Sequence, residues 1–202
     1  MHQPPLVPET MKRIRAFISL TLPDTISASI RHVQEQLAGH RLKVRWIRAE
    51  NIHLTLKFLG EIDATRIDAI DAAVAEAAAE KAPFHLSAKG VGVFPNIKRA
   101  RVIWIGVAGQ VNALTELQHN MASRLDTIGF PRDRRRYSGH LTIGRSKGAI
   151  DAGSLMNAMA EIRSFESEPF IVNRVSIFRS ELHSTGAVYT ELRTVPLMPH
   201  LA

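Results

Sequence analysis

One four-residue pattern occurs twice in the chain, as His53-Leu54-Thr55-Leu56 and again as His140-Leu141-Thr142-Ile143. Each copy lies in an apolar segment typical of a β-strand and follows a segment with helical spacing of its apolar residues. A duplicated half, or two lobes related by a pseudo-twofold axis, leaves this kind of repeat in a sequence. The repeat therefore favours a fold with two similar halves, each contributing one histidine.

The rest of the chain alternates strand and helix patterns, and no Pro/Ser-rich linker divides it. We therefore expect one bilobal domain over residues 13–202, preceded by a flexible, proline-containing extension over 1–12. Gly60 is expected to close the strand that holds the first motif. Strands are predicted at 14–20, 44–47, 52–58, 84–94, 101–107, 139–145, 170–178 and 187–192, and helices at 24–39, 63–81, 111–128 and 151–162.

The composition narrows the chemistry that the chain can perform. It contains no cysteine, which excludes disulfides, thiolate metal sites and cysteine nucleophiles and favours a reducing cytoplasm. The first residues carry no apolar segment of signal-peptide length, and no segment approaches a membrane span of about 20 apolar residues. A formal net charge of +7 makes a polyanionic partner plausible. Two basic clusters occur, each typical of a solvated loop when taken alone: Arg132, Arg134, Arg135 and Arg136, and Lys98, Arg99 and Arg101.

Strand alternation places the histidine and the threonine of each motif on the same face. In the first motif, His53 and Thr55 point away from the core, while the apolar neighbours Leu54, Leu56 and Phe58 point into it. An imidazole with a pKa of about 6.5 can accept or donate a proton near neutral pH. A hydroxyl can donate a hydrogen bond to a phosphate oxygen. Two such units facing one groove would suit phosphodiester chemistry without a metal.

Other interpretations of the motifs remain. A lone H-x-T on a strand is usually a surface histidine beside a β-branched residue, and only the second copy argues against that interpretation. A zinc site would have two ligands in His53 and His140, but no Cys or H-E-x-x-H pattern supplies a third. We therefore expect no metal and no cofactor. The histidines without a paired context are interpreted as structural or surface residues: His32, His85, His119, His183 and His200.

With these motifs the chain resembles the two-histidine (2H) phosphoesterase superfamily. The resemblance is strongest to its RNA 2′,3′-cyclic phosphodiesterase branch, the LigT-like or ThpR-like proteins formerly called 2′-5′ RNA ligases. It extends from Arg13 to Leu197, and one departure is Gly139, where the family usually has proline before the second histidine. Besides both motifs, the similar segments are Arg15-Ala16-Phe17-Ile18, Val44-Arg45-Trp46-Ile47, Asn51 to Glu61, Gly90 to Pro95, Phe178 to Leu182 and Gly186 to Tyr189.

This resemblance implies an α+β fold of two pseudo-twofold related antiparallel sheets backed by helices, with the active-site groove between the lobes. It implies His53 as proton donor to the leaving O3′ and His140 as proton acceptor from water. Thr55, Thr142 and Arg145 would bind the phosphate of an RNA with a 2′,3′-cyclic phosphate terminus. Phe17 and Trp46 are possible stacking partners of a base, and Arg132, Arg134, Arg135 and Arg136 are possible RNA contacts near the groove mouth.

Three functions stay open at this point. The first is hydrolysis of RNA 2′,3′-cyclic phosphates to 2′-phosphomonoesters. The second is 2′-5′ RNA ligation or 2′-5′ oligonucleotide hydrolysis with the same histidines, and the third is a non-catalytic module that binds RNA ends. The sequence indicates no membrane association and no obligate protein partner.

Overall fold

A computed structural model describes residues 12–184 and 186–198 of the chain. The flexible extension expected over 1–12 lies outside the described residues except for Lys12. All four predicted helices are present, and no helix in the described ranges has the length and apolar character needed to cross a membrane. The elements are β1 (Arg13–Leu20), α1 (Asp24–Gly39), β2 (Val44–Trp46), η1 (Ala49–Asn51), β3 (Leu54–Asp63), η2 (Ala64–Arg66), α2 (Ile67–Ala79), β4 (Phe84–Phe94), η3 (Ile97–Arg99), β5 (Val102–Gly109), α3 (Val111–Thr127), β6 (His140–Ser146), α4 (Ala152–Glu161), β7 (Phe170–Val172), β8 (Arg174–His183) and β9 (Gly186–Pro196).

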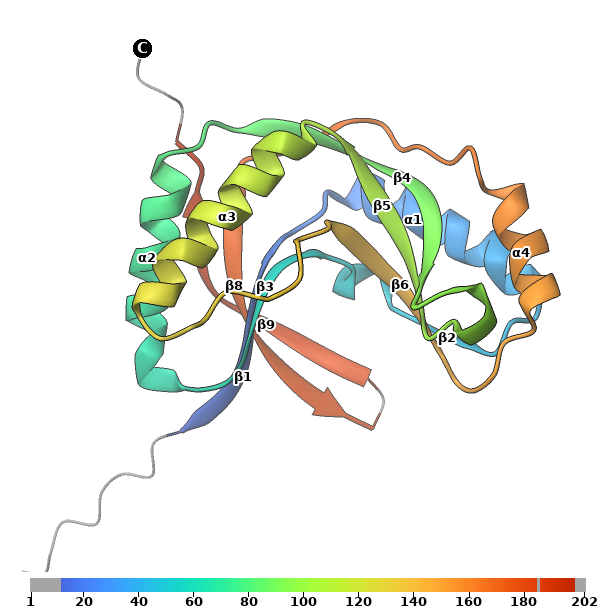
Figure 1. Ribbon diagram of the computed structural model, residues 1–202, viewed down its shortest axis with the longest axis horizontal. Coiled ribbons are helices and arrows are strands. Elements are labelled where there is room, and N and C mark those ends of the chain that lie inside the picture. Colours follow the sequence, from blue (N-terminus) through green and yellow to red (C-terminus); the bar gives the residue numbers. More distant parts are fainter. Residues whose placement is uncertain (1–11, 185, 199–202) are drawn as a thin grey trace, which may run out of the picture.

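Nine strands form one curled antiparallel sheet, in the order β7-β4-β5-β6-β3-β1-β8-β9 with β2 paired to β6 (Figure 1). The sheet has two halves, one of β1, β3, β8 and β9 and the other of β2, β4, β5, β6 and β7. They join where β3 pairs with β6, at Leu54 opposite Leu141. These two leucines occupy the same position in the two motifs, so a local twofold axis passes between them. The α+β class and the pseudo-twofold arrangement are confirmed, with the two expected sheets joined into one.

The helices pack on the sheet in two pairs, α2 with α3 and α1 with α4, so the first and last helices of the chain form one pair. Helices α2 and α3 pack together and against β3, β8 and β9, whereas α1 passes behind β4 and β5 and α4 packs beside α1 and against η3 (Figure 1). Buried Gln34 on α1 donates hydrogen bonds to the carbonyls of Ile47 and Ile143, both at 2.8 Å. Because α1 precedes the first motif but covers the strand of the second, the two halves interlock.

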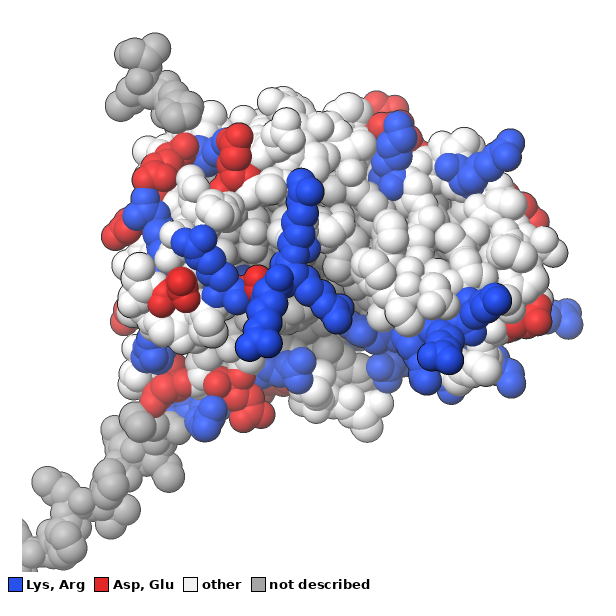
Figure 2. All heavy atoms as spheres, in the orientation of Figure 1, with Lys and Arg blue, Asp and Glu red and all other residues white. Residues whose placement is uncertain are grey.

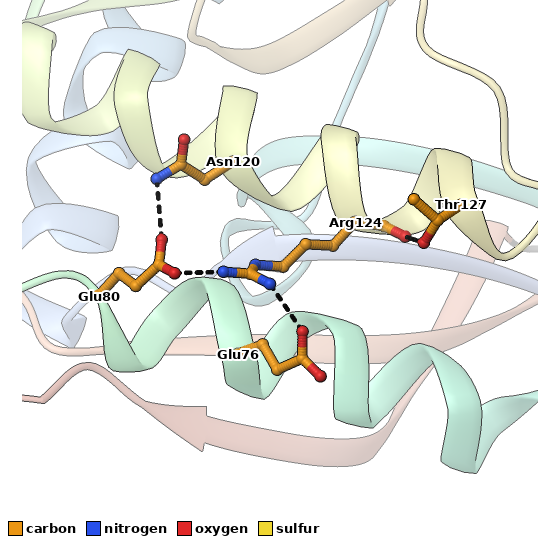
Figure 3. A network of polar contacts seen from close by, with 5 residues as sticks. All are labelled: Glu76, Glu80, Asn120, Arg124 and Thr127. Atoms are coloured by element: carbon orange, nitrogen blue, oxygen red, sulfur yellow. Dashed lines mark hydrogen bonds and ion pairs between the residues drawn. The ribbon is translucent and has the colours of Figure 1, made fainter.

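The α2–α3 pair buries an alanine-rich face and is fastened on its outer side by ion pairs. Arg124 of α3 donates to Glu76 of α2 and to Glu80 at the C-cap of α2, and Asn120 also donates to Glu80 (Figure 3). The crevice between these helices has a volume of about 630 Å³. Its charged groups are already bonded to one another, so it offers no free polar group for chemistry.

Two strand predictions were wrong in detail. The predicted strand at 170–178 is two strands, because β7 pairs with β4 in one half and β8 pairs with β1 in the other. Gly60 does not end β3, which continues to Asp63 with Gly60 at φ +75° beside an irregularity in the β1–β3 register. Neither event changes the apolar pattern, so neither was visible in the sequence.

A register shift between β1 and β3 also reverses the predicted facing of one side chain. The shift falls between Ile18 and Ser19 of β1, opposite Lys57 and Thr55 of β3. Beyond it, Lys57 turns inward and is 4% exposed, whereas Phe58 turns outward and is 64% exposed. The prediction that Phe58 belongs to the core face was therefore wrong.

Candidate active site

The two motifs lie side by side on the concave face of the sheet junction. Leu54 and Leu141 are fully buried and directly opposed, so their side chains share one face. The alternation of each strand then directs the histidines and threonines to the opposite face. This antiparallel register brings His53 next to Thr142 and His140 next to Thr55. The structure thus joins four residues that are far apart in the chain into one group.

Both imidazole rings are held by the same hydrogen bond. Nδ1 of His53 lies 2.8 Å from the carbonyl oxygen of Asn51, and Nδ1 of His140 lies 2.9 Å from that of Ser138. A carbonyl oxygen only accepts, so Nδ1 carries the proton in each ring. Nε2 remains as the nitrogen that can exchange a proton with a substrate. In both motifs the accepting carbonyl belongs to the residue two positions before the histidine. The sequence contains this spacing, but it does not show the turn that directs each carbonyl toward the ring.

Aromatic side chains fix the orientation of His53. Phe17 stacks on the imidazole at 4.6 Å between ring centroids, and Tyr189 contacts it edge-on at 5.2 Å. Phe17 is itself 3% exposed and stacks on Phe178 at 5.4 Å. Its ring therefore supports the histidine and offers little area to a base, and its predicted stacking role stays a prediction. Sequence reasoning did not select Tyr189 as a site residue.

A second aromatic pair supports His140. Phe94 contacts the ring edge-on at 5.1 Å, and Trp104 contacts it at 6.3 Å. Trp104 lies flat against Gly92 of β4, where an added Cβ would come within 2.1 Å of the indole. Glycine at this position thus leaves room for the indole. Each catalytic candidate has its own pair of aromatic supports, one pair per half of the sheet.

Burial lowers the pKa of His53 below its ordinary value, and the hydrogen bond to the Asn51 carbonyl partly offsets that effect. The cause is desolvation, because the aromatic neighbours exclude water that would stabilise the imidazolium. His53 is therefore mostly neutral at neutral pH in the free protein. An anion bound beside it would favour the protonated form.

A groove of about 600 Å³ extends from these motifs. His53, Thr55, Thr142 and Arg145 line it. His140 is not among the lining residues, and the strand register places it opposite Thr55, which is. Trp46 and Phe17 also line it. So do residues of the β8–β9 hairpin that sequence reasoning did not select as site residues, among them Ser180, His183 and Tyr189. His183 is exposed, in agreement with its interpretation as a structural or surface histidine, and it lies at the rim of this groove.

The electrostatic character of the groove is positive. Its lining includes the guanidinium groups of Arg15, Arg45, Arg48 and Arg145 and, among the described residues, no Asp or Glu. Such a surface attracts a phosphate and disfavours neutral or cationic ligands. Asn51 closes one side by donating a 2.9 Å hydrogen bond to the carbonyl of Ala187 in the hairpin.

The arginine run does not enter this groove. None of Arg132, Arg134, Arg135 and Arg136 belongs to its lining. Arg132 pairs with Asp126 at 3.8 Å, and Arg136 lines a separate small cavity beside α3. The predicted contact of these arginines with RNA stays a prediction.

Buried Lys57 connects the first motif strand to the segment that leads into the second. Its Nζ donates a 2.7 Å hydrogen bond to the carbonyl of Pro131 and lies 3.6 Å from the carboxylate of Asp133. Tyr137 makes a second connection, donating at 3.1 Å to the carbonyl of Thr55. Burial raises the pKa of Tyr137 well above its ordinary value, so its hydroxyl stays a donor. Sequence reasoning missed both residues.

We expect Lys57→Met to lower the free energy of unfolding by roughly 1–3 kcal/mol, because it leaves the Pro131 carbonyl without its donor. Urea unfolding monitored by circular dichroism measures this loss. Lys89→Met is the matched control, since that lysine is exposed and its ion pair with Glu166 should contribute less than about 1 kcal/mol. An equal loss of unfolding free energy in the two variants would contradict a stabilising role for the hydrogen bond between Lys57 and the Pro131 carbonyl.

Within the residues that the structure describes, no group of three or more His, Asp or Glu side chains is arranged to hold a metal ion. The two motif histidines therefore have no third protein ligand of these types beside them.

Comparison with known proteins identifies relatives over most of the chain. The profile of the family described as LigT like Phosphoesterase matches twice, at residues 20–104 and 105–189. Each match contains one H-x-T motif, in agreement with the twofold arrangement of the sheet. Among curated proteins, the RNA 2′,3′-cyclic phosphodiesterase of Methanothermobacter thermautotrophicus is 32% identical over 185 residues, covering 92% of this chain and 100% of the relative. That of Archaeoglobus fulgidus is 34% identical over 184 residues, covering 89% and 98%.

Solved structures show the same fold. The TT0787 protein of Thermus thermophilus superimposes with a TM-score of 0.76 at 24% identity, covering 91% of this chain and 98% of that one. E. coli LigT in complex with 3′-AMP superimposes with a TM-score of 0.73 at 22% identity, covering 93% and 100%.

Proposed function

Because the chain belongs to the LigT-like phosphoesterase family, we propose that it opens 2′,3′-cyclic phosphates at the ends of RNA. One observation carries this proposal: two H-x-T motifs meet across one strand pair, with both Nδ1 atoms bonded to carbonyls. The relatives of about 30% identity named for this activity support the choice of substrate.

Two histidines with free Nε2 atoms can catalyse this hydrolysis as an acid–base pair. His140 accepts a proton from water while the water oxygen bonds to phosphorus. The bond between phosphorus and O3′ breaks, and His53 gives its proton to O3′. The phosphate stays on O2′, so the product is a 2′-phosphomonoester. After turnover His140 is protonated and His53 neutral, and exchange with solvent restores both.

The surroundings of His53 suit the donor role once substrate is bound. Its pKa is lowered by burial, so the imidazolium is a stronger acid than a solvated histidine. The negative charge of the bound phosphate favours protonation of the ring at that stage. The Asn51 carbonyl holds the other nitrogen, so the proton leaves from Nε2.

The remaining groove residues suit the phosphate itself. Thr55 and Thr142 each lie across the strand pair from a histidine, where a hydroxyl can donate to a non-bridging oxygen. Arg145 lines the same groove and adds positive charge. Trp46 is a candidate partner for a base. No cofactor, membrane or obligate protein partner enters this proposal, and a cytoplasmic location is part of it.

The proposal is tested with an oligonucleotide that ends in a 2′,3′-cyclic phosphate, incubated with the protein in EDTA. We expect turnover to persist in the chelator and the product to carry a 2′-phosphate, read by phosphorus NMR against both monoester standards. A predominantly 3′-phosphate product would overturn the orientation of substrate between the histidines. Turnover lost in EDTA and restored by zinc would overturn the metal-independent mechanism, and binding without turnover would favour the RNA-end binding module.

A further inference from the structure

Six exposed cations form a continuous basic edge where β2, β6 and the β4–β5 connection meet. They are Arg45, Lys98, Arg99, Arg101, Arg145 and Lys147. Arg45 and Arg145 are opposed across the β2–β6 pair, and the amide of Ser146 donates a 2.9 Å hydrogen bond to the carbonyl of Arg101. These contacts join the cluster at 98–101, which alone is typical of a solvated loop, to the strand of the second motif.

The basic edge carries uncompensated charge. Within the described part of the chain, none of its six side chains pairs with a carboxylate, and segments 44–46, 97–102 and 144–148 contain no Asp or Glu. On neighbouring α4, Glu161 pairs with His40, and Asp151 caps the helix. Several cations elsewhere are paired with acids: Lys57, Lys81, Lys89, Arg124, Arg132, Arg179 and Arg193.

The opposed arginines favour an anionic ligand at this place. Like charges directly across an antiparallel pair destabilise it, and Arg45 lies opposite Arg145. An anion bound between them would remove that repulsion. Both arginines line the groove, so the basic edge begins inside the proposed active site and continues to the outside at Lys98 and Arg99.

Two groups of cations stand out on the visible face of the molecule. Figure 2 shows one at the lower right, over the end that holds β2 and β6 in Figure 1, and another over the segment between α3 and β6. The group between α3 and β6 is the arginine run. There Arg132 pairs with Asp126, and the neighbouring Asp133 lies near Lys57. The basic edge therefore has the larger uncompensated charge and the direct connection to the groove.

We propose that the basic edge binds the phosphodiester backbone of the RNA strand upstream of its cyclic phosphate. The inference rests on the proposed function and adds the path of the chain. Arg145 stays with the reacting phosphate, Arg45 opposite it holds the next phosphate upstream, and Lys98, Arg99 and Arg101 hold the following ones. The contacts are electrostatic and indifferent to base sequence. The arginine run on the other side of the motifs contributes less.

Two triple variants that remove equal charge test this path. One is Lys98→Gln/Arg99→Gln/Arg101→Gln, and the matched control is Arg134→Gln/Arg135→Gln/Arg136→Gln. Each is assayed with a ten-nucleotide RNA and with a mononucleotide, both ending in a 2′,3′-cyclic phosphate, across a salt series. In the edge variant, kcat/KM for the RNA relative to the mononucleotide should fall about 10-fold or more. Its slope of log KM against log salt should decrease by about 2, since each contact to a single strand contributes about 0.7.

The control variant should keep most of the RNA preference and the salt slope, and Arg99→Lys/Arg101→Lys should keep the slope because it keeps the charge. The proposed path would be overturned if the edge variant kept the wild-type salt slope, or if the control variant lost more kcat/KM for the RNA than the edge variant did. In either case, turnover of the mononucleotide would show that the proposed function still holds. If the wild type turns over neither substrate, the proposed function fails. The path is then tested by fluorescence anisotropy with a labelled ten-nucleotide RNA bearing a 3′-phosphate, with the same slopes expected.

Discussion

Replacing either His53 or His140 by alanine should lower kcat for a 2′,3′-cyclic phosphate by roughly 10²–10⁴-fold, the usual contribution of a general acid or base. Each variant removes one Nε2 and leaves the other ring held by its carbonyl, at Asn51 or Ser138. Stopped assays with a cyclic mononucleotide measure the effect without any contribution from RNA binding. The value for KM should change much less than kcat, because neither ring is the main source of charge in the groove.

The double variant distinguishes a concerted pair from two independent contacts. Residues that act as one unit are non-additive, so His53→Ala/His140→Ala should lose much less than the product of the two single effects. His119→Ala is the control, because His119 is exposed on α3 and does not line the groove. Losses that multiply fully, or a single variant with less than a 10-fold effect, would count against acid–base catalysis by these two rings.

The helices and most strands could be predicted from the sequence because their apolar periodicity is uninterrupted. The pairing of the two motifs could be predicted because the same four-residue pattern occurs twice with the same facing. In the structure this pattern becomes a twofold contact at Leu54 and Leu141. The two family matches, one per motif, have the same origin.

What the sequence did not show depends on partner strands and on local irregularities. The shift opposite Lys57 depends on pairing with β1, and the split near Asn173 depends on a change of partner between β4 and β1. The aromatic supports Tyr189 and Trp104 are distant in sequence from the histidines that they contact. A periodicity argument describes one segment at a time and therefore cannot find these contacts.

Gly139 stands where the family usually has proline, and its packing in the structure shows what this difference does. Glycine alone, just before His140, suggests a loose start of the strand. In the structure an added Cβ would lie 3.0 Å from Leu114 and 3.1 Å from Val107. The site is closely packed. The hydrogen bond between His140 and the Ser138 carbonyl spans Gly139, and the Tyr137 hydrogen bond to Thr55 holds the segment just before it.

We expect Thr55→Val and Thr142→Val each to lower kcat by roughly 10²–10³-fold, the size of effect seen when one hydrogen-bond donor to a developing oxyanion is removed. Valine keeps the β-branched shape that suits a strand and removes only the hydroxyl. In the antiparallel register the two threonines lie across from His140 and His53, so each hydroxyl can hold one non-bridging oxygen while the rings exchange protons. As the phosphorus becomes five-coordinate, charge on those oxygens grows and the hydrogen bonds strengthen.

Serine at the same positions separates the role of the hydroxyl from that of shape. Thr55→Ser and Thr142→Ser keep the donor and should retain activity within about 10-fold of the wild type, because only the methyl group is lost. Circular dichroism of the valine variants should match the wild type, since both threonines are half-buried on the groove face and outside the hydrophobic core. If valine raised KM and left kcat unchanged, the hydroxyls would bind the ground state and the transition state equally. The threonines would then position the phosphate, and stabilisation of the growing charge would fall to Arg145 and the other groove arginines.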